Sequence, residues 1–132
     1  YWPGGVDIHT MFLRLSPEGV PVPHQAHTDS TMGQYSLMVY LNQRRHAKGG
    51  TSLLRHRENG MVRDPLDEGQ TKLWLRDMNA PEQWEVVGMC PMAPNRGFIF
   101  PANRFHRAEP VGGFGKTARD ARLVLTAFFS EA

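Results

Sequence analysis

The sequence predicts an all-β domain, either a sandwich, a jelly roll or a barrel, and two observations support this fold class. The 132 residues include 13 glycines and 10 prolines spread along the chain, which leaves little room for long helices. The segments between these breaks are short and rich in β-branched and aromatic residues, as strands are. The length predicts a single domain, residues 1–132, and the apolar fraction of 40% suffices for a core.

Seven segments have the length and composition of strands. In residues 8–15, alternate positions place Met11, Leu13 and Leu15 on one face, and residues 35–42 (YSLMVYLN) have the composition of a buried strand. The other expected strands are residues 51–55, 72–75, 84–89, 97–100 and 122–129. Residues 56–81 are the most polar and least regular part, and predict either a surface loop or an insertion with a short helix.

Composition and charge exclude several classes of protein. The net charge is only +2 and the basic residues form no long stripe, so there is no strong nucleic-acid signal. No apolar run approaches the length of a membrane span, so no membrane partner is expected. The single cysteine, Cys90, excludes an internal disulfide and a Cys-based zinc site, and favours a reducing, cytoplasmic location. Because the chain begins with Tyr1, we expect a preceding N-terminal segment to have been lost.

The most informative short motif is His27-Thr28-Asp29. In an extended segment, residues two apart project from the same face, so His27 and Asp29 would lie side by side. An imidazole and a carboxylate can hold a divalent metal, and a second histidine completes the facial triad of non-haem Fe(II) oxygenases. His106 follows an apolar segment and a short turn, and can supply that ligand. His24 is a rival ligand only if the register differs.

Arg122 begins an otherwise apolar expected strand, on the same face as Val124 and Thr126. A guanidinium that points into a β-core needs an anion, and a carboxylate held by two hydrogen bonds is its natural partner. The alternative is that Arg122 lies at the strand end and extends to water.

The order of these motifs resembles that of the 2-oxoglutarate and Fe(II)-dependent dioxygenases, and is most similar to their prolyl-4-hydroxylase-like branch. The resemblance covers about residues 8–130. The matching elements are His27-Thr28-Asp29, Tyr40-Leu41-Asn42, Gly49-Gly50-Thr51, residues 95–100, His106 and Arg122. The fold that it implies is a double-stranded β-helix, a jelly roll, with a few peripheral helical or loop insertions.

The resemblance also implies roles for individual residues. His27, Asp29 and His106 match the iron ligands. Arg122 matches the residue that pairs with the C5 carboxylate of 2-oxoglutarate, and Tyr40 matches a tyrosine that donates to that carboxylate. The implied cofactors are Fe(II), 2-oxoglutarate as cosubstrate and O2, with ascorbate as a stimulant. The implied reaction is hydroxylation with release of succinate and CO2.

The sequence departs from the family pattern in three places, of which the rival ligand His24, three residues before His27, is one. Arg122 follows His106 by sixteen residues, which is longer than the usual spacing, so Lys116 and Arg119 compete with Arg122 for the C5 carboxylate. No tyrosine precedes the His27 motif where close relatives often have one; Leu13 and Leu15 occupy that strand. We expect residues 57–81 and 112–120 to form the substrate rim.

The substrate class stays open at this point: a small molecule, an amino-acid residue and a nucleobase all fit, and no oligomeric state is indicated. Two other classes of function are also compatible with the sequence. A cupin-like metalloprotein that does not use 2-oxoglutarate would bind metal independently of Arg122. A non-catalytic β-sandwich that serves as a binding or structural module would lose little beyond local stability if His27 became alanine.

Overall fold

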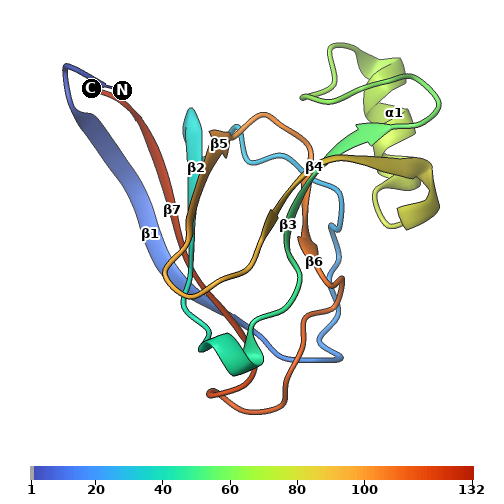
Figure 1. The fold of residues 1–132 in the computed structure, drawn as a ribbon. Helices are drawn as coiled ribbons and strands as arrows, with labels where there is room; N and C mark the ends of the chain where they lie inside the picture. The colour runs from blue at the N-terminus through green and yellow to red at the C-terminus, as the bar shows by residue number, and fades with distance from the viewer. Residues whose placement is uncertain (1) are drawn as a thin grey trace.

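The computed structural model describes residues 2–132, which form two antiparallel sheets and one α-helix (Figure 1). The first sheet has the strand order β1-β7-β2-β5, and the second has the order β4-β3-β6. The strands are β1 (Val6–Ser16), β2 (Tyr35–Tyr40), β3 (Gly50–His56), β4 (Trp84–Pro91), β5 (Gly97–Pro101), β6 (His106–Glu109) and β7 (Arg122–Glu131). The helix is α1 (Glu68–Asp77), and short 3-10 helices cover Arg44–His46 and Pro81–Gln83.

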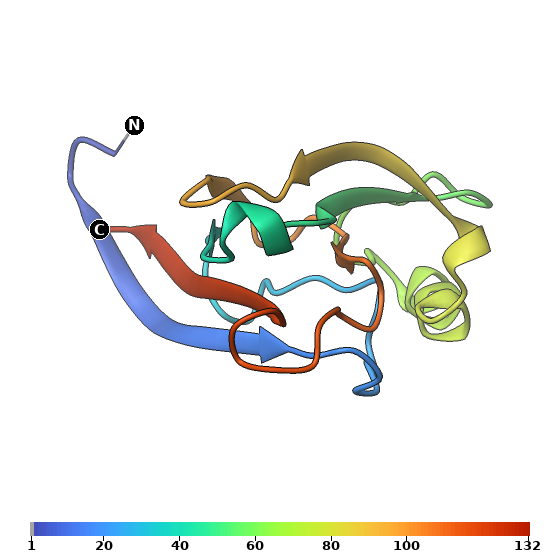
Figure 2. The same ribbon diagram turned by 60° about the horizontal axis from the view of Figure 1, so that its bottom comes forward.

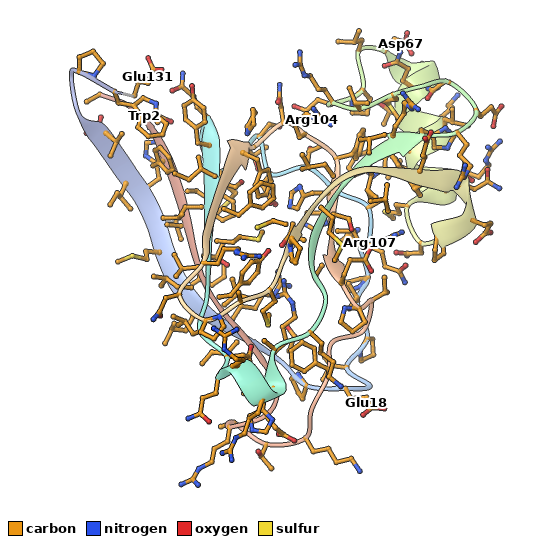
Figure 3. All side chains as sticks on the ribbon, viewed as in Figure 1. Trp2, Glu18, Asp67, Arg104, Arg107 and Glu131 are labelled. Atoms are coloured by element: carbon orange, nitrogen blue, oxygen red, sulfur yellow. The ribbon has the colours of Figure 1, made fainter. Side chains whose placement is uncertain are left out.

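The two sheets form separate layers (Figure 2), and side chains from both fill the space between them (Figure 3). Side-chain hydrogen bonds join the layers directly. The Tyr40 hydroxyl lies 2.9 Å from Thr51 Oγ1, and Arg122 Nη2 donates to the Gly50 carbonyl over 3.3 Å. The all-β prediction is therefore confirmed at the level of a two-sheet sandwich.

Six of the seven expected strands overlap observed ones, and the seventh is wrong. Residues 72–75 belong to α1, because local helix signals outweigh their apolar composition. Asp67 caps the helix by accepting a hydrogen bond from the Gln70 amide at 2.8 Å, and Lys72 pairs with Glu68 one turn earlier. The alternative expectation for residues 56–81, an insertion with a short helix, is confirmed. Within residues 2–132, no helix combines the length and apolar character needed to cross a bilayer.

Strand β1 alternates as expected, but its apolar side faces outward. Met11 and Leu13 are 60% and 63% exposed on the outer face of the first sheet. The side chains of Phe12, Arg14 and Ser16 are instead directed into the space between the layers, where they line a cavity. The strand therefore places Arg14, whose side chain is exposed to solvent, at the wall of the open cavity.

The Gly49-Gly50 pair allows three chain segments to meet at the start of β3. A Cβ at Gly49 would collide with the Glu109 carbonyl at the end of β6, and a Cβ at Gly50 would collide with the Cys90 carbonyl in β4. Gly49 also has a φ of +65°, which side-chain-bearing residues rarely adopt. Glycine at these two positions lets β3 pair closely with β4 on one side and β6 on the other.

A buried hydrogen bond between His56 and Asp77 holds α1 against the second sheet. His56 at the end of β3 is fully buried, and its Nε2 lies 2.7 Å from Asp77 Oδ2 at the end of α1. Asp77 also accepts two hydrogen bonds from Arg76, and its backbone carbonyl accepts one from the Trp84 indole. This cluster holds the helix against the apolar side chains of Leu54, Trp84 and Phe105.

We expect Asp77→Asn to lower the free energy of unfolding by about 2–3 kcal/mol, because buried His56 loses a charged hydrogen-bond partner. Hydrogen bonds from Arg76 and from His56 lower the pKa of Asp77 from 3.8 to about 2. The stabilisation is therefore complete above about pH 4 and disappears as the pH falls through about 2. Urea titrations at several pH values measure both effects.

The matched control is Glu85→Gln, which breaks the exposed ion pair with Arg55. Its effect on stability should be much smaller, because water screens an exposed pair. An equal loss in the two variants would contradict a stabilising role for the buried pair.

Candidate metal centre

The candidate centre forms where the segment before β2 meets the start of β6. His27 and His106 form an isolated antiparallel bridge, in which each backbone amide donates to the other's carbonyl, over 3.2 Å and 3.0 Å. The Asp29 amide donates to the Ala102 carbonyl at 2.8 Å, so the extended segment continues past the bridge. This pairing brings side chains that are far apart in the sequence to one place.

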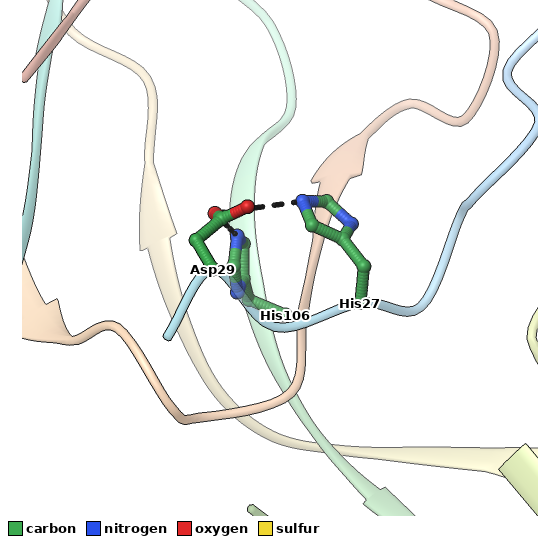
Figure 4. Close-up of side chains that lie close together, drawn as sticks. All are labelled: His27, Asp29 and His106. Atoms are coloured by element: carbon green, nitrogen blue, oxygen red, sulfur yellow. Dashed lines mark ion pairs between the residues drawn. The ribbon is translucent and has the colours of Figure 1, made fainter. Parts of the chain in front are cut away.

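The three side chains converge as the sequence predicted (Figure 4). Asp29 Oδ2 lies 3.7 Å from His27 Nε2 and 3.0 Å from His106 Nε2. One potential ligand atom from each residue lies within 4.8 Å of the others, a spacing that could hold one metal ion. His24 lies outside this group, and its Nδ1 is 3.4 Å from the Met78 sulfur.

Both imidazoles are oriented in the same way. His27 Nδ1 donates to the Gln25 carbonyl at 3.1 Å, and His106 Nδ1 donates to the Arg104 carbonyl at 2.9 Å. A carbonyl partner fixes the proton on Nδ1 and leaves the lone pair of Nε2 facing the third ligand, as metal-binding histidines require. His106 Nε2 is buried and has no hydrogen-bond partner with acceptable geometry among the described residues. A divalent metal would satisfy this atom.

Burial and charge set the protonation states for cation binding. Burial, together with the neighbouring His106, lowers the pKa of His27 to about 4, although Asp29 opposes the shift. Burial raises the pKa of Asp29, but His106 and His27 outweigh it and hold this pKa below its ordinary value. At neutral pH, His27 is therefore uncharged and Asp29 is ionised, which are the forms that bind a metal.

Helix α1 supports the segment that carries His27. The Trp74 indole donates to the Ala26 carbonyl at 2.8 Å, and the Ala26 amide donates to the Met78 carbonyl at 2.9 Å. The Asn79 side chain bonds Pro23 and Gln25 on the same segment. The polar insertion thus fixes the backbone immediately before the first ligand.

A cavity of about 360 Å³ opens beside the three residues. The cavity wall consists of the inner faces of β1 and β7, Met38 of β2, the start of β6, the segment 22–32 and the loop after β6. Besides the histidines, its charged lining residues are Arg14, Asp29, Arg107 and Arg122. Gly112 and Gly113 contribute to the wall, as expected of the 112–120 loop, whereas no described residue of 57–81 does. The expected contribution of 57–81 is wrong because α1 packs behind the His27 segment.

Arg122 lies in the cavity wall and is 3% exposed. Burial lowers the pKa of its guanidinium, which nevertheless stays charged at neutral pH. Its Nη2 donates to the Gly50 carbonyl, but its Nε has no partner, and no carboxylate pairs with it within residues 2–132. A buried cation without a counterion is costly, so this position is suited to an anionic ligand.

The rival cations lie elsewhere. Lys116 and Arg119 are outside the cavity, in an exposed turn whose backbone is held by Asp120 and Thr117. Arg119 lines a separate small pocket beside Asn42.

Tyr40 is fully buried and its hydroxyl is already engaged. It lies 2.9 Å from Thr51 Oγ1 and 3.2 Å from the Cys90 carbonyl, and burial raises its pKa to about 12. Tyr40 is not among the residues that line the cavity. Donation to a ligand carboxylate would require its hydroxyl to leave these partners.

Sequence reasoning missed the contributions of β1 and of Arg107. Phe12 and Arg14 line the cavity because β1 turns its polar-patterned side inward. Arg107 lies next to the candidate ligand His106 and donates to Glu109 over 2.8 Å. The only signal in the sequence for these contributions was the alternation in β1. It shows that Arg14 and Ser16 share one face of the strand, but it does not show which face lines the cavity.

We expect Trp74→Phe to weaken metal binding up to about tenfold, because it removes one hydrogen bond that fixes the backbone before His27. Trp84→Phe is the matched control, since it removes an equivalent indole bond to the Asp77 carbonyl. Both variants should lose some thermal stability, but only Trp74→Phe should change the metal dissociation constant measured by calorimetry. Equal metal affinities in the two variants would contradict a positioning role for Trp74.

Comparison of the chain with protein-family models gives no match, and comparison with curated proteins gives none either.

Proposed function

We propose that the chain is a non-haem Fe(II), 2-oxoglutarate-dependent oxygenase that hydroxylates its substrate. The observation that carries the proposal is the orientation of the two imidazoles. Both have Nδ1 bound to a backbone carbonyl and Nε2 directed at Asp29, and the Nε2 of His106 is buried without a hydrogen bond among residues 2–132. Two histidines and one carboxylate on one side of a metal leave other positions free for ligands.

We further propose that the sandwich is a double-stranded β-helix, and the strand order supports this. Strands β1, β2, β5 and β7 form one sheet, while β3, β4 and β6 form the other. The His27–His106 bridge adds the metal-binding segment beside β6, as an incipient fourth strand of the second sheet. The chain then crosses repeatedly between two four-membered layers, as a jelly roll does.

In this proposal His27, Asp29 and His106 hold the metal from one side. Bound iron supplies the redox chemistry that couples 2-oxoglutarate decarboxylation by O2 to oxidation of a substrate C–H bond. Burial of His106 and the carbonyl partners of both histidines keep the ligands from rotating. The cavity walls limit the access of water to the metal.

Arg122 binds the C5 carboxylate of 2-oxoglutarate in the same proposal. Three features support this role: it lines the cavity, it is buried, and its Nε has no partner among the described residues. A bound carboxylate would supply the counterion that the protein itself does not. Thr126 and Val124 lie on the same face of β7 and line the cavity between Arg122 and the open end of the strand.

We expect anaerobic addition of Fe(II) and then 2-oxoglutarate to give a weak visible charge-transfer band in the wild type. Asp29→Ala should abolish the band and weaken metal binding by more than about a hundredfold, because it removes the only anionic ligand of the group. His24→Ala is the matched control and should retain the band, since His24 lies in the cavity wall but outside the group. A folded wild-type protein that binds Fe(II) but gives no band would contradict the proposed function.

We expect Arg122→Gln to raise the dissociation constant of 2-oxoglutarate by about tenfold to a hundredfold, the effect of losing a charge-assisted pair worth about 1.5–3 kcal/mol. Its affinity for Fe(II) should stay near that of the wild type, which also shows that it folds. Arg119→Gln, outside the cavity, should leave both constants unchanged. Metal binding without any effect of Arg122 would favour a cupin-like metalloprotein instead.

A further inference from the structure

A second arginine without a counterion, the solvent-exposed Arg14, lines the cavity from β1. Arg14 pairs in register with Val124, and the next inward residue, Ser16, pairs with Arg122. The two arginines are therefore diagonal neighbours on the inner face of adjacent strands, and both line the cavity. No ion pair or hydrogen bond of the Arg14 side chain occurs within residues 2–132.

The charges of the proposed complex balance without Arg14. A divalent metal and Arg122 carry three positive charges, and Asp29 with the two carboxylates of 2-oxoglutarate carries three negative ones. Arg107, the other arginine in the wall, is neutralised by Glu109 at 2.8 Å. Arg14 is then the one uncompensated charge among the described residues of the cavity wall. An unpaired guanidinium beside a reaction centre favours a ligand that carries a negative charge.

The form of the site indicates the class of anion. A guanidinium presents parallel N–H groups that match the two oxygens of a carboxylate. The cavity, at about 360 Å³, lies in the size range of small-molecule sites. Phe12, Val22 and Met32 supply apolar surface beside the charged groups, which suits a short organic chain.

We propose that Arg14 binds a carboxylate of the primary substrate, so that the substrate is a small organic acid rather than a neutral or cationic compound. This inference depends on the proposed function, because it assigns Arg122 and the metal to 2-oxoglutarate. Arg14 is then a specificity-determining residue, and it places the acid group of the substrate on the β1 side of the metal.

The test uses N-acetylglycine and its neutral analogue N-acetylglycinamide as probes of the anaerobic Fe(II)–2-oxoglutarate complex. Paramagnetic broadening of the probe's NMR lines, compared with the Zn(II)-loaded protein, gives the affinity near the metal. In the wild type the acid should bind at least about tenfold more tightly than the amide. Arg14→Gln should abolish this preference, and Arg14→Lys should retain part of it, because lysine keeps the charge but not the planar fork.

Arg44→Gln is the control for loss of one positive charge, since Arg44 is exposed in the 3-10 helix outside the cavity. This variant should prefer the acid over the amide as strongly as the wild type does. Three results would overturn the inference: equal binding of the two probes, no binding of either, or a preference that survives Arg14→Gln. A rise in the 2-oxoglutarate dissociation constant as large in Arg14→Gln as in Arg122→Gln would also overturn it, by placing Arg14 in the cosubstrate site.

The same experiment separates this inference from the proposed function. If the wild type gives no charge-transfer band, the proposed function fails, and the Zn(II)-loaded protein then reports the preference for the acid by saturation transfer alone. If the Zn(II)-loaded protein prefers the acid probe and this preference depends on Arg14, the carboxylate site is supported although the oxygenase function is not. If the Zn(II)-loaded protein shows no such preference, both the carboxylate site and the oxygenase function are contradicted.

Discussion

The backbone bridge between His27 and His106 is the interaction on which the candidate centre depends. Its two hydrogen bonds place the ring centroids 4.3 Å apart and direct both Nε2 atoms toward Asp29. Without the bridge, the His27 motif would offer only two candidate ligands, on a segment that belongs to none of the strands β1 to β7. With it, the segment becomes an extension of the second sheet, and its side chains acquire the alternation of a strand.

The rest of the molecule stabilises that bridge from two sides. On one side, α1 binds the backbone before His27 through Trp74 and Met78, and the buried His56–Asp77 pair holds α1 to β3. On the other side, the Gly49-Gly50 pair lets β3 approach β6 closely enough to position His106. The polar insertion and the glycine pair, which are far from the ligands in the sequence, thus both determine their geometry.

The cavity wall contains groups that are unfavourable for stability alone. His106 Nε2 and Arg122 Nε are buried without hydrogen bonds among the described residues, and each such atom costs folding free energy. Arg14 and Arg122 are also like charges on adjacent strands, which repel one another. Departures from the rules of stable packing concentrate at sites that bind a ligand, since the ligand supplies the missing partners. The unpaired His106 Nε2 is therefore suited to a bound cation, and the unpaired arginines of the cavity wall are suited to bound anions.

Much of the fold could be predicted from local patterns. Six strands follow from short β-rich segments between glycines and prolines, because those patterns depend only on residues close in the chain. The strand predicted for residues 72–75 was wrong, because a segment of four mixed apolar and polar residues fits a strand or a helix equally well. The Asp67 cap is the local feature that favours the helix. The outward face of Met11 and Leu13 could not be predicted, because alternation identifies two faces of a strand without saying which one the partner sheet covers.

The sequence by itself identified the candidate donor set, His27, Asp29 and His106, and the presence of an arginine at the start of the last strand. Residue type and spacing carry that information because they restrict which side chains share a face. Only the tertiary structure decided that the Nε2 of His106 is buried without a partner, that Tyr40 is engaged with Thr51, and that Arg14 faces the cavity. These properties depend on how the two sheets stack and on which strand faces are enclosed, and such long-range packing leaves no periodic signal in the chain.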